Sequence, residues 1–260
     1  MANQLDPLIQ RHRRARDRLI RMHYENSIGH IGGNLSCIDA LLVLHHDILR
    51  KEDVLILSKG HSAGALYVSL WSVGRIKEDA LTTFHQNGTH LGAHPSTNWI
   101  NDIKFATGSL GHGLPIANGI ALASKLSDSE QSIYCLTSDG EWQEGSMWEA
   151  LIFASHHNLR NLTILVDVNG LQAYGSTEKV ASMHDLKSKL DSFDVVIKSI
   201  DGHDPHKIIK AIKTKHKSAP LVILLETVKG NGIESIENKL SSHYLPLTKE
   251  QFKKYKLNSK

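Results

Sequence analysis

Ser138-Asp139-Gly140-Glu141-Trp142-Gln143-Glu144-Gly145 and, downstream of it, Val166-Asp167-Val168-Asn169-Gly170-Leu171-Gln172 are the two stretches that decide the fold. Asn169 follows Asp139 by thirty residues. A carboxylate, an amide and a backbone carbonyl suit a hard cation in octahedral geometry, as a magnesium-bound diphosphate requires. Asp139, Asn169 and the Leu171 carbonyl offer all three ligands. The pair therefore predicts a site for a metal and a diphosphate.

The residues around these loops predict parallel strands. Residues 133–137 and 162–166 are β-prone runs that end at the two loops, and residues 144–158 between them have the apolar spacing of a helix. The order strand, helix, strand gives parallel strands, and ligands collect outside the carboxyl ends of such strands. We expect both loops at one sheet edge. Taken alone, Asp-Gly and Asn-Gly are equally typical of ordinary turns.

Further apolar runs extend this frame. They predict strands at residues 54–57, 195–197 and 221–225, and helices at 114–126 and 205–217. The pattern of Ser36 and Asp39 predicts a helix that begins by capping at Ser36. With 260 residues, 40% of them hydrophobic, the chain can bury a full core. The prediction is an α/β fold of one domain, residues 1–260, with a mainly parallel sheet and helices on both faces.

The two loops carry a family resemblance, since an Asp-Gly dipeptide about thirty residues before an Asn resembles the thiamine diphosphate signature. More specifically, the chain resembles transketolase over nearly its whole length. Five further segments occur in the family's order: Ser27-Ile28-Gly29-His30-Ile31-Gly32-Gly33, Leu57-Ser58-Lys59-Gly60-His61-Ser62, Thr89-His90-Leu91-Gly92-Ala93-His94-Pro95, Thr107-Gly108-Ser109-Leu110-Gly111-His112-Gly113, and Thr227-Val228-Lys229-Gly230 followed by Ser242-His243.

The resemblance implies a thiamine diphosphate-binding fold and a transferase that moves a two-carbon ketol unit from a ketose or ketose phosphate to an aldose. Its cofactors would be thiamine diphosphate and Mg²⁺, with Ca²⁺ or Mn²⁺ as alternatives. The implied metal ligands are Asp139, Asn169 and Leu171. The implied cofactor contacts are His61, Gly108, Leu110, Ser138, Asp139, Gly140 and Asn169.

The resemblance also implies catalytic roles for His30, His94, His243 and Glu144. His30 and His243 would face the reacting carbonyl and aldehyde oxygens, and His94 a donor hydroxyl. Imidazole suits these roles because it titrates near neutral pH. Glu144 would lie at a contact between subunits and relay protons; a solvated carboxylate in the first turn of a helix is the alternative.

Two departures from the family pattern affect these expectations. Ser138 stands where the family usually has Gly before the Asp, and His112 where many members have Gln. We expect cofactor binding to survive both changes, while the substrate remains open.

The length of the chain determines the assembly that we expect. By the resemblance, a complete transketolase comprises three domains, and 260 residues are enough only for the first of these domains. The resemblance therefore implies that the pyrimidine-binding and carboxyl-terminal domains are absent from this chain. A partner subunit would carry the pyrimidine-binding domain, with the activating Glu. Two copies of each chain would form a heterotetramer.

Two other functions stay open. The chain could belong to a thiamine diphosphate enzyme with a 2-oxoacid donor, such as a deoxyxylulose phosphate synthase or a 2-oxoacid dehydrogenase. It could also be a non-catalytic cofactor-binding paralogue. His94 together with His243 favours a ketose donor, and retention of the metal ligands argues against a non-catalytic protein.

Composition agrees with a cytoplasmic enzyme. The net charge of +3 is too small to indicate nucleic acid as a partner, and the arginines from Arg11 to Arg21 belong to a helix with one apolar stripe and a basic, solvated face. No apolar run is long enough for a membrane span, and no signal core precedes the arginines. Cys37 and Cys135 lie in apolar settings, which argues against a disulfide framework.

Overall fold

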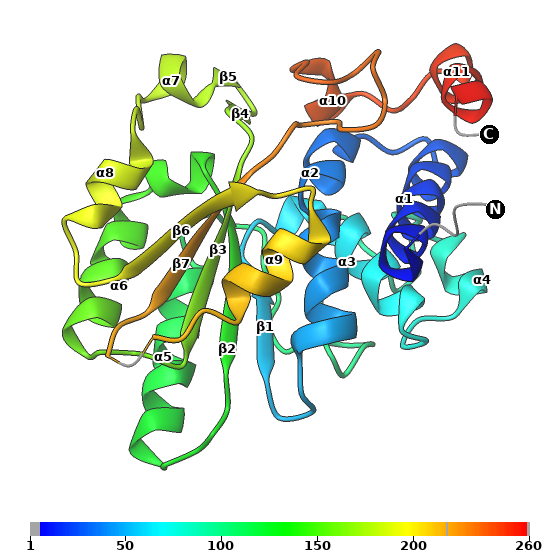
Figure 1. The fold of residues 1–260 in the computed structure, drawn as a ribbon. Helices are drawn as coiled ribbons and strands as arrows, with labels where there is room; N and C mark the ends of the chain where they lie inside the picture. Colours follow the sequence, from blue (N-terminus) through cyan, green and yellow to red (C-terminus); the bar gives the residue numbers. More distant parts are fainter. Residues whose placement is uncertain (1–5, 217, 259–260) are drawn as a thin grey trace.

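Aliphatic and β-branched runs form a five-stranded parallel sheet of order β1-β2-β3-β7-β6 at the centre of the computed structural model, which describes residues 6–216 and 218–258 (Figure 1). A two-stranded antiparallel hairpin, β4–β5, follows β3. The strands are β1 (Val54–Leu57), β2 (Ile133–Ser138), β3 (Leu162–Val168), β4 (Leu171–Gln172), β5 (Gly175–Ser176), β6 (Val196–Asp201) and β7 (Leu221–Glu226).

Helices cover both faces of the sheet (Figure 1). Successive strand residues point to opposite faces, so Leu136 and Leu165 join one buried cluster while Cys135 and Ile164 join the other. The first cluster includes residues of α1 (Pro7–Glu25), α2 (Ile31–Val43), α3 (Ala63–Ser72) and α9 (Pro205–Ile212). The second includes residues of α5 (Gly113–Leu126), α6 (Gly145–His156) and α8 (Leu186–Asp191). The predicted α/β layering is confirmed.

Short helical segments complete the chain. They are a π-helical turn η1 (Leu44–Ile48), the 3₁₀ turns η2 (Gly60–Ser62) and η3 (Gly140–Gln143), and the helices α4 (Glu78–Leu81), α7 (Thr177–Val180), α10 (Ser241–Tyr244) and α11 (Lys249–Asn258). In the part of the chain that the structure describes, no helix has the length and apolar character to cross a bilayer. Cys37 and Cys135 are free and buried, as expected.

Strand register brings the two opening loops together. Ser138 pairs with Asp167 across β2 and β3, and Asp167 pairs with Leu225 across β3 and β7. The three strands therefore end at the same level, and the segments that follow them meet at the carboxyl edge of the sheet.

The predicted helix start at Ser36 is wrong. Helix α2 already begins at Ile31 and continues through Gly32 and Gly33. Ser36 lies inside the helix, with its Oγ 3.0 Å from the Gly33 carbonyl, and Asp39 is an ion-pair partner of Arg16 at 2.7 Å. Tertiary packing around the two glycines outweighs their low helix propensity.

The predicted helix at 205–217 is too long. Helix α9 ends at Ile212, because Lys213, Thr214, Lys215 and His216 offer no apolar side chain that would continue its buried stripe. Lys217 lies outside the described residues.

His23, on α1, makes stability depend on pH. Its side chain is fully buried, Nδ1 lies 3.2 Å from the Ile28 carbonyl, and Nε2 has no partner among the described residues. Burial lowers the pKa of His23 to about 4, whereas an unfolded histidine titrates near about 6.5. Between these values the unfolded chain binds the extra proton. The free energy of unfolding therefore falls as the pH drops from about 6.5 to 4, by up to about 1.4 kcal/mol per pH unit from this group.

We expect His23→Gln to have a shallower pH dependence of unfolding than the wild type. Urea unfolding at pH 7.5, 6.0 and 5.0 measures the slope, with His184→Gln, at an exposed histidine, as the control. Identical slopes for His23→Gln and wild type would contradict the assignment.

Candidate active site

The predicted metal loops lie side by side at the carboxyl edge of the sheet. The Gly170 N–H donates to Asp139 Oδ2 at 2.6 Å, and the Gly140 N–H donates to Oδ1 at 2.8 Å. Asn169 Oδ1 accepts from the Leu171 N–H at 3.1 Å. The structure thus brings together the residues of the predicted ligand set.

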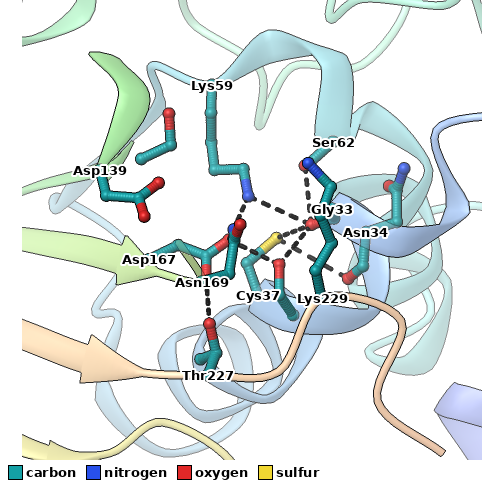
Figure 2. Close-up of polar contacts among 12 residues, drawn as sticks. Gly33, Asn34, Cys37, Lys59, Ser62, Asp139, Asp167, Asn169, Thr227 and Lys229 are labelled. Atoms are coloured by element: carbon teal, nitrogen blue, oxygen red, sulfur yellow. Dashed lines mark hydrogen bonds and ion pairs between the residues drawn. The ribbon is translucent and has the colours of Figure 1, made fainter. Parts of the chain in front are cut away.

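Behind these loops lies a buried ion pair that the sequence analysis did not assign (Figure 2). Lys59 and Asp167 are both fully buried, and the Lys59 ammonium donates to Asp167 Oδ2. Ser36 Oγ donates to the same oxygen at 2.6 Å, and Asn169 Nδ2 at 3.1 Å. Thr227 Oγ1 donates to Oδ1. Burial alone would raise the pKa of Asp167, but Lys59 and the hydroxyl donors hold it below its ordinary value.

A second buried lysine, Lys229, follows β7. Its ammonium donates to the Leu171 carbonyl and to His243 Nδ1, both at 3.0 Å. Burial, and then the charge of Lys59, lower the pKa of Lys229 to about 8. Both lysines share a sequence pattern that could have indicated a place in the site, since each comes shortly after a short apolar strand and directly before a glycine.

Three of the four predicted histidines form a cluster. Ring centroids are 4.9 Å apart for His30 and His243, 5.6 Å for His61 and His243, and 6.0 Å for His30 and His61. The backbone N–H of His30 donates to the backbone carbonyl of His243 at 3.1 Å, and the backbone of His30 has a φ of 59°. Burial, and then the Lys229 charge, lower the pKa of His243 to about 3. Burial also lowers the pKa of His30 and His61, so all three rings are neutral at pH 7.

His94 lines a cavity of about 330 Å³ together with Gly108 and His112. A Cβ on Gly108 would lie 3.1 Å from the His94 ring, so the loop backbone approaches the imidazole closely. Burial, and then the neighbouring charge of His85, lower the pKa of His94. Gly108 also lies against Gly60, which directly precedes His61, because a Cβ on Gly60 would lie 2.8 Å from the Gly108 nitrogen.

The other predicted residues lie around the same loops. Ser138 is buried at the end of β2, and Leu110 is half-buried. A Cβ on Gly140 would lie 3.2 Å from Gln172 Cβ. Glu144 is exposed at the start of α6, beside the Gly111 loop.

The donor set fits a divalent cation. Burial and the neighbouring Asp167 carboxylate raise the pKa of Asp139 to about 6, so its charge lacks compensation that a cation would supply. An amide oxygen and a carbonyl on the adjoining loop are hard ligands of the kind that Mg²⁺ takes. Among the described residues no three His, Cys, Asp or Glu side chains gather as a metal cluster, and the predicted set, with one carboxylate, needs none.

A parallel α/β sheet with these loops at its carboxyl edge defines a domain of the thiamine diphosphate-binding class. A family model described as "Transketolase, thiamine diphosphate binding domain" matches residues 22–259, and the chain belongs to this family. The predicted resemblance is confirmed, and the chain is a transketolase-type transferase.

Relatives of similar length carry related names. An apulose-4-phosphate transketolase subunit of Phocaeicola vulgatus is 33% identical, with 96% of this chain and 92% of the relative covered. The 6-deoxy-6-sulfo-D-fructose transketolase subunit SqwG of Clostridium sp. is 35% identical, with 87% and 86% covered.

Solved structures share the fold. The chain superposes on transketolase from Leishmania mexicana with a TM-score of 0.90 at 22% identity, covering 98% of this chain and 42% of that one. For transketolase from Campylobacter jejuni the TM-score is 0.86 at 28% identity, with 98% and 43% covered. The chain thus spans less than half the length of these transketolases.

Proposed function

We propose that the chain is the diphosphate- and Mg²⁺-binding subunit of a two-chain transketolase. The observation that carries the proposal is the junction of the Asp139 and Asn169 loops by the 2.6 Å Gly170–Asp139 hydrogen bond. The His30, His61 and His243 cluster is linked to that junction through Lys229, which contacts both His243 and the Leu171 carbonyl.

The metal would be held by Asp139, Asn169 and the Leu171 carbonyl. Leu171 O now accepts from Lys229, whose ammonium would turn towards the diphosphate when the cation takes that oxygen. His61, Gly108, Leu110, Ser138 and Gly140 line the rest of the cofactor path. When bound, thiamine diphosphate supplies the carbanion chemistry of ketol transfer, and the protein positions the reactants.

The histidines would act as neutral hydrogen-bonding groups. Because the Lys229 ammonium donates to His243 Nδ1, the proton of the neutral His243 ring is on Nε2, which can donate to a substrate oxygen. His30 Nδ1 is buried and has no hydrogen-bond partner among the described residues, so a substrate oxygen would meet the other ring nitrogen, Nε2. His94, at the more open end of the site, suits a donor hydroxyl.

A partner subunit would supply the pyrimidine-binding domain and the activating Glu. The names of relatives that this chain covers almost completely, both called subunits, support this assignment. Residues 1–260 would act as one domain in a cytoplasmic heterotetramer of two copies of each chain, with Glu144 at the contact between them. Sugars or sugar phosphates would be the substrates.

Reconstitution tests the proposal. We expect the purified chain alone to transfer no ketol unit above background, and addition of the cognate pyrimidine-domain subunit, with Mg²⁺ and thiamine diphosphate, to restore transfer. A panel of ketose donors with and without phosphate, each paired with aldose acceptors, identifies the substrate, and pyruvate serves as the 2-oxoacid control. Strong ketol transfer by the chain alone would contradict a divided active site.

A further inference from the structure

Glu141 is a fully buried carboxylate that none of the roles above uses. It follows Gly140 in η3, between the Asp139 loop and α6. Burying a carboxylate is costly unless hydrogen bonds compensate. Burial raises the pKa of Glu141, and no ion pair within 4.0 Å involves it among the described residues. Its compensation must come from hydrogen-bond donors.

The donors come from two loops and from the end of strand β2. Ser58 Oγ donates to Glu141 Oε1, and the Gly111 N–H donates to the same oxygen at 2.8 Å. The Ser138 N–H donates to Oε2 at 3.4 Å. Ser58 Oγ in turn accepts from the Gly113 N–H at 3.1 Å. One side chain therefore connects the loop of Lys59 and His61, the loop of Gly108 and Leu110, and the strand end before Asp139.

Close packing leaves these loops little freedom to move separately. A Cβ on Gly113 would lie 2.3 Å from Ser58 Oγ, and one on Gly111 would lie 2.4 Å from Ser146 Oγ. A Cβ on Gly60 would likewise lie 2.8 Å from the backbone of Thr107 and Gly108. The two loops are therefore closely packed against their neighbours in the same region where Glu141 joins them by hydrogen bonds.

We propose that Glu141 is a positioning residue, which sets the relative placement of three segments: the loop of Lys59 and His61, the loop of Gly108 and Leu110, and the end of β2 that precedes the metal ligand Asp139. The proposal rests on the proposed function. The Glu141 side chain places one oxygen on the Ser58 hydroxyl and the Gly111 N–H and the other oxygen on the Ser138 N–H. A glutamine would keep the Oε1 contacts but turn an amide N–H₂ towards the Ser138 N–H.

Binding of thiamine diphosphate in Mg²⁺ by Glu141→Ala tests the proposal. Loss of an outer-shell partner typically weakens a metal site about 10- to 100-fold, and we expect that rise in Kd, with a smaller rise for Glu141→Gln. In the enzyme reconstituted with its partner, the apparent KM for the cofactor should rise while kcat at saturating cofactor changes by less than about threefold, since no reacting group is removed.

The matched control is Asn118→Ala. Asn118 is also buried, and its Nδ2 donates to the Ala150 carbonyl at 2.7 Å, joining α5 to α6 away from the three segments that Glu141 connects. The Asn118→Ala variant should have a lower melting temperature and an unchanged Kd for thiamine diphosphate. If Glu141→Ala and Asn118→Ala both destabilise the chain and leave the Kd unchanged, Glu141 is only structural and the proposal is wrong.

Two further outcomes are informative. If Glu141→Ala does not fold, the variants Glu141→Gln and Ser58→Ala test the proposal instead, because each weakens the hydrogen-bonded connection between Ser58, Glu141 and Ser138 at one end. A wild-type Kd for thiamine diphosphate in both variants would overturn the proposal. A wild-type chain that binds no cofactor, alone or with its partner, would refute the proposed function and this inference with it. A loss confined to the Glu141 and Ser58 variants supports both.

Discussion

Asp139→Ala is expected to raise the Kd for thiamine diphosphate in Mg²⁺ by more than about 100-fold, because it removes the single anionic metal ligand, and loss of outer-shell partners alone costs about 10- to 100-fold. The remaining ligands, Asn169 and the Leu171 carbonyl, are neutral. Calorimetry of the wild type and the variant measures the difference. Asp191→Ala, at an exposed carboxylate on α8, is the control and should bind as the wild type does.

The same variant should lose little stability without ligand. Burial and Asp167 raise the pKa of Asp139 to about 6. A raised carboxyl pKa disfavours the folded state above the unfolded pKa, here by roughly 2–3 kcal/mol at pH 7. Relief of that cost offsets the acceptors lost to Gly140 and Gly170. Unchanged cofactor affinity in Asp139→Ala would refute the metal assignment, and unfolding of the unliganded variant would refute the account of its charge.

Asp167→Ala is expected to lower the free energy of unfolding by about 3–5 kcal/mol, the typical cost of leaving a buried charge without its partner. Lys59 is fully buried and would lose its counter-ion, while Ser36 and Thr227 would lose their acceptor. Urea unfolding at pH 7.5 measures this loss.

The double variant Lys59→Met/Asp167→Leu separates charge from shape. Replacing both members of a buried pair by apolar residues is often neutral or stabilising, so the double variant should be more stable than Asp167→Ala. It should still bind the cofactor weakly, because Asn169 Nδ2 no longer has the carboxylate that orients it. A loss below about 1 kcal/mol in Asp167→Ala would show that the pair is not essential to the fold.

The sheet and its loops were predictable because strands such as 133–137 and 162–166 are short apolar runs bounded by turn residues. The register of Ser138 with Asp167 then places both metal loops at one edge, as the strand order requires. His30, His61 and His243 lie together because each belongs to a segment that returns to this edge of the sheet.

The burial of the charged residues at the site could not be predicted from the sequence. Lys59, Asp167 and Glu141 lie near the carboxyl ends of apolar strands, where a polar residue ordinarily marks a strand end at the surface. Their burial depends on partners such as Ser36 and Ser58, which lie far away in the sequence. The helix start at Ser36 failed for a related reason: capping describes local hydrogen bonds, whereas Ser36 bonds to Asp167, 131 residues away.

Competition between inorganic diphosphate and thiamine diphosphate tests the central claim, that this chain holds the diphosphate end of the cofactor and a partner holds the aminopyrimidine. Calorimetry in Mg²⁺ should give the isolated chain similar affinities for the two, within about tenfold, since the metal and phosphate contacts dominate both. Addition of the partner subunit should then tighten binding of thiamine diphosphate but not of inorganic diphosphate. A chain that binds neither ligand alone, or a partner that tightens both equally, would contradict the claim.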